Sequence, residues 1–266
     1  MERTGKRFRN HLMGLVLLAG VHLGSACSVK EDRDLCPGLL SLDFVCPDIP
    51  DARHVGLLVT SDEDIVWSDT VDVMMNGDGY SVSVPQTRLH VRAWTGDDAM
   101  VTESGLVIPY GQDCPRVYMH DSDIMVTGEY FHEVVTLRKN HCVMTLNTEG
   151  EGRIPSDLKL RGNVAGYDAE GAPLYGSFEF LLEDGGLEEG YKAVLPRQMD
   201  ASLMLVIDDG GGSHKAFALG QYIVSSGYDW TAPDLEDITV TLDYALTEIR
   251  LIISGWESVY EYEMEI

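Results

Sequence analysis

One cysteine near the start of the chain has the surroundings needed for covalent lipid attachment. Cys27 directly follows three small residues, Gly24–Ala26, which in turn follow an apolar run at 12–23 and a basic segment at 3–9. The apolar run is about a dozen residues long, too short to cross the roughly 30 Å core of a bilayer as a helix, so residues 1–26 are typical of a signal peptide. A signal peptidase accepts small residues before its cut, and the freed cysteine can carry lipid. We therefore expect a covalent diacylglycerol and an acyl lipid on Cys27. The alternative is a secretory signal with a chance cysteine.

The residues around Cys27 refine this expectation. The site is similar to the lipobox of bacterial lipoproteins, although Leu23 stands four rather than three residues before the cysteine. Lys30, Glu31 and Asp32 follow closely, and a Lys before acids resembles the surface-export signal of Bacteroidetes lipoproteins. We expect a lipid-anchored protein of the outer membrane, exposed on the cell surface. The alternative is retention on the periplasmic leaflet.

Four further cysteines, Cys36, Cys46, Cys114 and Cys142, are candidates for disulfides. An even number of cysteines in an oxidising compartment favours disulfides, and four allow three pairings, among which the sequence does not choose. None has the close-set Cys/His spacing of a structural zinc site.

Other reactive side chains do not assemble into a catalytic or metal-binding motif. His120, Asp121 and Asp123 form a His/Asp cluster that we interpret as a surface loop, and Cys142 beside His141 is a better disulfide partner than nucleophile. Asp208–Gly210 lacks the alternating carboxylates of a calcium loop and predicts a hairpin turn. We expect no enzyme activity, no metal and no cofactor other than the lipid on Cys27.

The charge of the chain excludes one class of partner. There are 19 Lys and Arg against 44 Asp and Glu, a net charge of -25, and loss of residues 1–26 removes one acid and four bases, which brings the charge to -28. Such a surface repels phosphate backbones, so nucleic-acid binding is not expected. The composition is 44% hydrophobic with 4 Trp and 12 Tyr, which indicates a folded rather than a disordered chain.

Apolar residues alternate with polar ones over many short stretches, which predicts β-strands. The expected strands are 40–45, 55–60, 65–67, 71–75, 80–84, 89–94, 133–137, 142–146, 157–164, 177–182, 193–196, 202–207, 215–219, 238–242 and 249–253. Asn76–Gly79 between two of them predicts a hairpin over 71–84, and Asp208–Ser213 predicts another. Tyr222–Val224 is β-branched and aromatic, so 221–226 is interpreted as a strand rather than a helical turn.

These patterns predict an all-β chain, and its length favours two β-sandwich domains in tandem. The polar, Gly-rich segment 147–155 is interpreted as the boundary between them, with a long loop as the alternative. The expected organisation is a signal peptide at 1–26, a lipidated tether at 27–36, an N-terminal sandwich at 37–148 and a C-terminal sandwich at 149–266.

Several segments together resemble the fimbrillin-associated anchor protein family of Bacteroidales. The segments are Cys27 with the acidic stretch and Asp34–Pro37, Phe131–Arg138 with Val143–Leu146, Leu219–Val224, Ser226–Trp230, Asp237–Ala245 and Gly255–Trp256. The resemblance implies two transthyretin-like β-sandwich domains. It also implies an anchor-type fimbrial subunit that keeps its lipid in the outer membrane and holds a shaft pilin by strand addition, although a tip or accessory role stays open.

An alternative function is a surface lipoprotein that binds glycan or another extracellular ligand through exposed aromatic residues. The candidates are Trp67, Trp94, Trp230 and Trp256, each of which could instead pack in a core.

Overall fold

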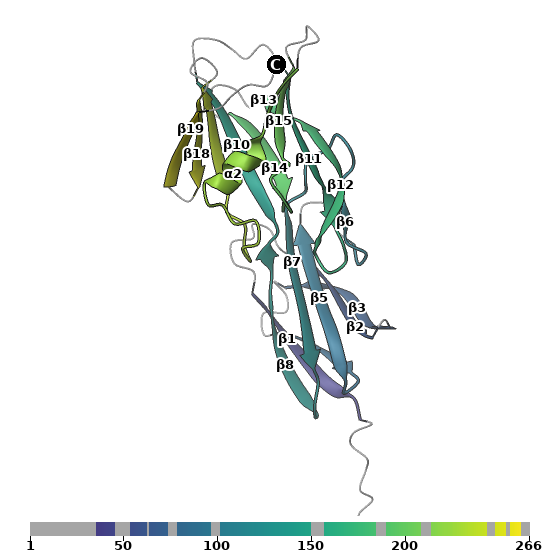
Figure 1. Ribbon diagram of the computed structural model, residues 1–266. Coiled ribbons are helices and arrows are strands. Elements are labelled where there is room, and N and C mark those ends of the chain that lie inside the picture. Colours follow the sequence, from purple (N-terminus) through teal and green to yellow (C-terminus); the bar gives the residue numbers. More distant parts are fainter. Residues whose placement is uncertain are drawn as a thin grey trace, which may run out of the picture. The chain divides into compact units, whose positions relative to one another are not determined.

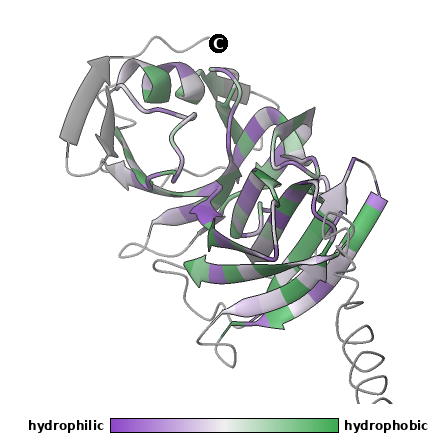
Figure 2. Ribbon diagram, turned by 90° about the horizontal axis from the view of Figure 1, so that it is seen from below, coloured by the Kyte–Doolittle hydropathy of each residue, from purple (hydrophilic) through white to green (hydrophobic). Residues whose placement is uncertain are grey.

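The computed structural model describes residues 36–45, 54–62, 64–73, 79–96, 102–149, 157–184, 190–208, 214–243, 248–253 and 256–261. Nearly all regular structure in these ranges is β-strand, and their one helix is α2 (Leu219–Ser225), which confirms the all-β prediction. Side chains alternate between apolar and polar along the strands, as Figure 2 shows. No helix in the described part of the chain is long and apolar enough to span a bilayer.

The first two sheets form a unit that we call the N-terminal lobe (Figure 1). A three-stranded sheet has the order β4-β1-β8, and a five-stranded sheet has the order β3-β2-β5-β7-β9. The strands are β1 (Gly38–Val45), β2 (His54–Ser61), β3 (Asp64–Asp72), β4 (Tyr80–Val84), β5 (Arg88–Gly96), β7 (Val117–Met125), β8 (Tyr130–Thr136) and β9 (Arg138–Lys139).

The other two sheets form the C-terminal lobe. A six-stranded sheet has the order β13-β14-β10-β17-β18-β19, and the second sheet has the order β12-β11-β15-β16, with β6 also paired to β11. The strands are β6 (Leu106–Val107), β10 (His141–Glu149), β11 (Asp157–Tyr167), β12 (Pro173–Leu181), β13 (Glu183–Asp184), β14 (Tyr191–Pro196), β15 (Met204–Asp208), β16 (His214–Phe217), β17 (Ile238–Asp243), β18 (Glu248–Ile253) and β19 (Trp256–Glu261).

The two lobes repeat one strand order. In each, the first strand lies between an antiparallel neighbour and the last strand of the repeat, to which it is parallel: β4-β1-β8 in one lobe and β14-β10-β17 in the other. The second sheets also correspond, since β3-β2-β5-β7 matches β12-β11-β15-β16. The lobes differ beyond the last strand, because β17 continues into β18 and β19.

The hydrophobic cores divide the chain earlier than the boundary predicted at 148/149. The N-terminal core includes residues from Leu40 to Leu137, whereas Cys142, Met144 and Leu146 on β10 belong to the C-terminal core. The reason is that β10 pairs with β14 and β17 along its length up to Glu149. The segment predicted as a linker therefore starts inside a strand.

A piece of the chain between β5 and β7 also belongs to the C-terminal core. Leu106, Ile108 and Cys114 are buried there, and Gly166 on β11 lies against Leu106. Gly166 has φ +150 and a Cβ would overlap the Leu106 carbonyl, so only glycine fits this approach.

The hairpin predicted over 71–84 is wrong. β3 pairs with β2, whereas β4 pairs with β1 in the other sheet, so the connection crosses between sheets. Side chains rather than backbone join the two strands: Trp67 Nε1 donates to the Tyr80 hydroxyl at 2.8 Å, which donates to Asp69 Oδ2 at 2.6 Å. The hairpin predicted at 208–213 is confirmed, since β15 and β16 pair as far as Asp208 and His214.

The strand predicted at 221–226 is also wrong, because α2 occupies these residues. Leu219 and Ile223 are one helical turn apart and both are buried in the C-terminal core. Gly220 approaches Ala201 so closely that a Cβ would lie 2.7 Å from its carbonyl oxygen. Gly227, with φ +88, ends the helix. Tertiary packing therefore overrides the β-propensity of Tyr222–Val224.

One half-buried carboxylate binds the crossing segment to β14. Asp113 Oδ1 accepts hydrogen bonds from the N–H groups of Val194 at 2.8 Å and Cys114 at 3.0 Å. Burial raises the pKa of Asp113 from 3.8 to about 6, despite these two donors.

We expect Asp113→Asn to change the pH dependence of stability. Because the folded pKa lies above the unfolded one, this group's contribution is full below pH 3.8 and is lost as the pH rises through 6. Asn keeps the acceptor oxygen without the charge, so the variant should be more stable at pH 7 by up to about 3 kcal/mol, and no more stable near pH 4. Urea unfolding across this range measures the difference. A difference that does not vary with pH would contradict the assignment.

Candidate functional site

The residues predicted to carry the lipid and the export signal, Cys27, Lys30, Glu31 and Asp32, lie outside the described residues, as does Cys46. The described chain begins at the exposed Cys36, two residues before β1. Because β1 is the middle strand of its sheet, the tether enters the N-terminal lobe at a strand that is bonded on both edges.

The edge of β8 that faces away from β1 is not covered by another described strand. Leu39 N donates to Glu129 O at 2.9 Å and Leu137 N donates to Val45 O at 3.1 Å, so odd-numbered residues of this segment face β1. The N–H and C=O groups of Tyr130, His132 and Val134 therefore face away, toward an edge that no described strand covers. We call these three residues the open edge of β8.

The corresponding edge in the C-terminal lobe is filled. β17 pairs with β18 over six residue pairs from Ile238–Ile253 to Asp243–Glu248, and β18 pairs with β19. The side chains on the open edge of β8 are exposed, 61% for Tyr130 and 44% for Val134, and both project from the outer face of the sheet. An extended chain beside β8 would find backbone partners and an apolar surface.

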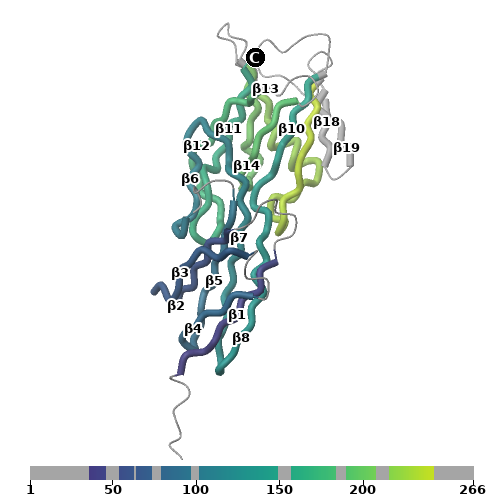
Figure 3. The backbone as a smooth tube through the Cα atoms, turned by 180° about the vertical axis from the view of Figure 1, so that it is seen from behind, coloured from purple at the N-terminus to yellow at the C-terminus, as the bar shows by residue number. Residues whose placement is uncertain are grey.

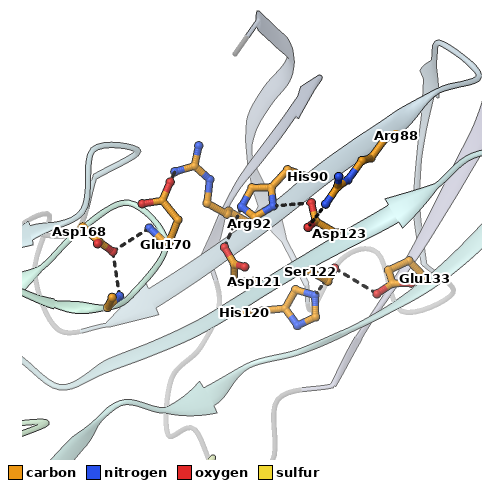
Figure 4. A network of polar contacts seen from close by, with 11 residues as sticks. Arg88, His90, Arg92, His120, Asp121, Ser122, Asp123, Glu133, Asp168 and Glu170 are labelled. Carbon is orange, nitrogen blue, oxygen red and sulfur yellow. Dashed lines mark hydrogen bonds and ion pairs between the residues drawn. The ribbon is translucent and has the colours of Figure 1, made fainter. Parts of the chain in front are cut away.

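His120 closes one end of this edge. Its Nδ1 lies 3.2 Å from the carbonyl oxygen of Thr136, the last residue of β8, and its Nε2 lies 3.1 Å from Ser122 Oγ, which donates to Glu133 at 3.2 Å (Figure 4). Burial lowers the pKa of His120, so the ring is neutral at pH 7. The open edge is accessible only up to Val134.

The His/Asp cluster predicted to be a surface loop is instead part of β7, so that prediction is wrong. Its polar residues alternate between the two faces of the strand and meet partners on each. On the outer face, His90 of β5 contacts Asp121 at 2.8 Å and Asp123 at 3.2 Å, and Arg88 binds Asp123 at 2.7 Å (Figure 4). No group of three or more His, Cys, Asp and Glu residues in the described ranges is arranged to hold a metal ion.

A pocket of about 230 Å³ opens beside this network. It is lined by Thr60, Asp62, Arg88, Leu89, His90 and Asp123. Donors and acceptors converge there, which suits a hydroxylated or zwitterionic ligand, although Arg88, His90 and Asp123 already bind one another.

Trp94 lies on the same strand as this network, half-buried over Gly56, where a Cβ would meet the indole Cζ2 at 2.7 Å. Trp67 is 39% exposed, and Trp230 is buried in the C-terminal core. The side chain of Trp256 lies outside the described ones. Trp67 and Trp94 therefore remain candidates for ligand contact. Trp230 instead packs in a core, which was the alternative role expected for each of these residues.

Acidic side chains hold the connection between the lobes. Asp234 accepts from Lys139 N at 2.8 Å and binds Arg138 Nη1 at 2.9 Å, while Asp237 accepts from Val143 N at 2.8 Å and binds Lys139 Nζ at 2.5 Å. Residues 138–143 are thus bonded to the segment that leads into β17 before the strands themselves pair.

Arg197 extends this connection. Its Nε donates to Asn140 Oδ1 at 2.7 Å, and its Nη1 donates to the carbonyl oxygens of Trp230 and, at 2.8 Å, Ala232. The buried Tyr167 hydroxyl donates to the Asn140 carbonyl and accepts from Arg197 N at 2.6 Å. Sequence reasoning missed this group, because its members are far apart in the chain and carry no shared motif.

Cys114 and Cys142 are buried in the C-terminal core as free thiols, so the structure does not contain the disulfides expected for these two cysteines. They flank β14 on opposite sides, since Cys114 N donates to Val194 O at 3.3 Å and Cys142 is paired with Leu195. Strands on either side of a third lie roughly 10 Å apart, whereas a disulfide needs Cα atoms within about 7 Å. Of the expected pairings, this fold excludes the one that contains a Cys114–Cys142 bond.

Cys142 and His141 do not form a nucleophile and base. Burial raises the pKa of Cys142 to about 12 and lowers that of His141 to about 4, so both are neutral at pH 7. The His141 ring contacts the backbone instead, with Nδ1 3.0 Å from the oxygen and 3.2 Å from the nitrogen of Val117.

Comparison with known proteins finds the same fold in several solved structures. No protein-family model and no curated protein sequence matches the chain. Among solved structures, a candidate polysaccharide-binding protein from Bacteroides thetaiotaomicron superposes with a TM-score of 0.64 at 14% identity, over 85% of this chain and 98% of that one. The fimbrial anchor protein Mfa2 from Porphyromonas gingivalis gives 0.63 at 13% identity, over 85% and 100%.

A candidate adhesin from Bacteroides ovatus gives a TM-score of 0.57 at 15% identity, over 89% of this chain and 99% of that one. At these identities the likeness shows a shared fold. The family resemblance is confirmed to that extent: the chain has the β-sandwich fold of fimbrial anchor and adhesin proteins of Bacteroidales.

We expect thiol labelling to distinguish the buried cysteines. Cys114 and Cys142 should resist a thiol reagent in the folded protein and react once it is unfolded without reductant, because their sulfur atoms are covered by the C-terminal core. Mass spectrometry of the labelled peptides reads out each site. Cys114→Ser and Cys142→Ser should each remove one labelled peptide only. A protein that shows neither thiol after unfolding would contradict the assignment.

Proposed function

We propose that the chain is a fimbrial subunit that is held in the outer membrane by lipid on Cys27 and joined to a shaft pilin by strand addition. Its location is the cell surface, at the base of a fimbrium, and its partners are other fimbrial subunits. The shared fold with a fimbrial anchor protein supports this function at the level of architecture.

The observation that carries the proposal is the difference between the two lobes at their last strands. The edge of β17 is filled by β18, whereas the same edge of β8 is left without a described partner. We infer that an extended strand of the shaft pilin takes this place. The backbone groups of Tyr130, His132 and Val134 would bind it, and His120 at Thr136 would limit its length.

The tether fits the same function. Cys27 and the Lys30, Glu31 and Asp32 export signal lead within a few residues to β1, which lies between β4 and β8 and contributes the fully buried Leu40 and Leu42 to the core. Removal of β1 would open the sheet and the core together. A subunit built in this way keeps its lipid-bearing segment, as an anchor must.

Ligand binding at the β5–β7 face is the second candidate function. The pocket beside His90, with Trp94 further along β5, offers polar groups and an aromatic surface of the kind that sugars use. One structural neighbour is named as a candidate polysaccharide-binding protein. In this case the protein would be a surface lipoprotein that binds glycan. Neither function requires a catalytic group, and we propose that the chain is not an enzyme.

We expect Val134→Pro to weaken the joint with the shaft pilin. Proline removes the N–H that faces the open edge, and an edge strand tolerates proline where that N–H points outward. Loss of one backbone hydrogen bond, together with the local distortion, should lower the affinity about tenfold. Co-purification of pilin with a tagged protein from outer membranes, followed by binding measurements with purified pilin, tests this.

Val134→Thr is the matched control, because it removes the same apolar side chain and keeps the N–H. It should retain pilin binding. If both variants bind pilin as the unchanged protein does, the strand does not add at β8. If no pilin co-purifies with any form while a glycan binds at the β5–β7 face, the ligand-binding function takes the place of the anchor.

We expect Cys27→Ala to abolish labelling by palmitate and to release the protein from the membrane fraction. Replacing Lys30, Glu31 and Asp32 by Ala should leave the lipid in place but protect the protein from protease added to intact cells. A Cys27→Ala protein that stays in the membrane at its processed size would show that the anchor lies elsewhere.

A further inference from the structure

We propose that the two parallel strand pairs, β1–β8 and β10–β17, act as mechanical clamps in series that resist a pulling force along the chain. A force between the membrane and a pilin strand added at β8 would load the β1–β8 pair, and this origin rests on the function proposed above, whereas the β10–β17 pair is loaded by a force applied along the chain itself. The resistance itself follows from the strand order and can be measured on the purified protein.

In the N-terminal lobe, the force would enter and leave through neighbouring strands. The tether leads into the start of β1, and the chain leaves for the C-terminal lobe from the end of β8 at Thr136. β1 and β8 are parallel over seven residue pairs, from Leu39–Tyr130 to Val45–Thr136 (Figure 3). Pulling the two ends apart therefore slides the strands along each other in opposite directions.

Such sliding loads the hydrogen bonds of the pair together rather than one after another. The bonds of a parallel ladder run across the strands, at an angle to the direction of sliding, and none can open far before its neighbours. The ladder is complete at both ends, since Leu39 N binds Glu129 O and Leu137 N binds Val45 O. The His132 Nε2 contact with Asp43 Oδ2, at 2.8 Å, joins the same two strands.

β1 is also held on its other edge. It pairs with β4 from Gly38–Val84 to Leu42–Tyr80, and its inward side chains Leu40 and Leu42 are fully buried. Sliding β1 out of the sheet would thus break two ladders and expose the core at the same time.

The C-terminal lobe repeats this geometry. The chain enters at the start of β10, and β10 and β17 are parallel from Met144–Ile238 to Glu149–Asp243, after which the chain continues through β18 and β19 in the same sheet. Further hydrogen bonds precede the first residue pair of β10 and β17. Asp237 accepts from Val143 N, Asp234 accepts from Lys139 N, and Leu235 N donates to Lys139 O at 3.0 Å. A force between the start of β10 and the end of β17 therefore loads this pair as a force between β1 and β8 loads theirs.

Single-molecule force spectroscopy on the processed chain, residues 27–266, tests the proposal. One pair of handles is attached at the N-terminus and at Asp243, the last residue of β17, so that the pull does not act on β18 and β19. A second protein carries one handle at the N-terminus and one inserted after the exposed Pro85, next to Val84. Val84 faces Gly38 in the antiparallel β1–β4 pair, so this geometry peels β1 from its neighbours one residue pair at a time.

We expect the pull between the N-terminus and Asp243 to give two unfolding events at forces several times that of the peeling geometry. Comparable forces in the two geometries would overturn the proposal. This comparison uses the same unsubstituted fold, so it does not depend on whether a variant folds.

Proline substitutions on β8 then test whether the hydrogen bonds between β1 and β8 carry the load. Glu133→Pro removes an N–H that faces β1, whereas Val134→Pro removes one that faces the open edge. Glu133→Ala controls for the loss of the Glu133 contact with Ser122. Glu133→Pro should lose the high-force event of the N-terminal lobe, and Val134→Pro and Glu133→Ala should keep it. Equal forces in the two proline variants would show that the β1–β8 ladder does not carry the load.

The two proposals fail separately. Val134→Pro is expected to weaken pilin binding and keep the unfolding force, and Glu133→Ala is expected to keep both. A clamp that resists force in a protein that binds no pilin would leave the mechanical inference standing and remove the anchor function.

Discussion

Each lobe is closed by hydrogen bonds between the first and the last strand of the strand order that the two lobes share. In the N-terminal lobe these are β1 and β8, about ninety residues apart, and in the C-terminal lobe β10 and β17 are separated by a similar length. No turn can bring such strands together, so the burial of Leu40, Leu42, Met144 and Leu146 must supply the driving force. The open edge of β8, the position of the tether and the connection between the lobes all follow from this closure.

Several acidic side chains also bind backbone groups of the fold. Asp168, Asp234 and Asp237 each accept hydrogen bonds from backbone N–H groups that the sheets leave unpaired. An ionised carboxylate forms stronger bonds to such donors than a neutral oxygen does. A part of the large negative charge therefore fixes turns and crossings, notably between residues 138 and 143. The composition does not reveal this role of the carboxylates, because it indicates only which partners the net charge repels.

The strands with alternating apolar residues could be predicted from the sequence, since β5 buries every second residue along its length and β1, β2 and β11 bury at least every second residue over part of theirs. β7 could not, because its polar residues pair with Arg88 and His90 on β5 and with Glu133 on β8. α2 and the crossing from β3 to β4 depend on distant packing. The open edge of β8 is equally invisible, because it requires the parallel pairing to be known first.

The segment from Leu106 to Cys114 lies between two strands of the first lobe in sequence but contributes to the core of the second. A cut of the chain at residue 140 would therefore affect the cores of the two fragments in different ways. The later fragment would lack part of its own interior, and the earlier one would carry exposed apolar residues that belong elsewhere. The repeated strand order makes the lobes look like separable modules. The core of the second lobe nevertheless needs residues that lie within the sequence of the first. Exchange of one lobe between related proteins would succeed only if this inserted segment travelled with the second lobe.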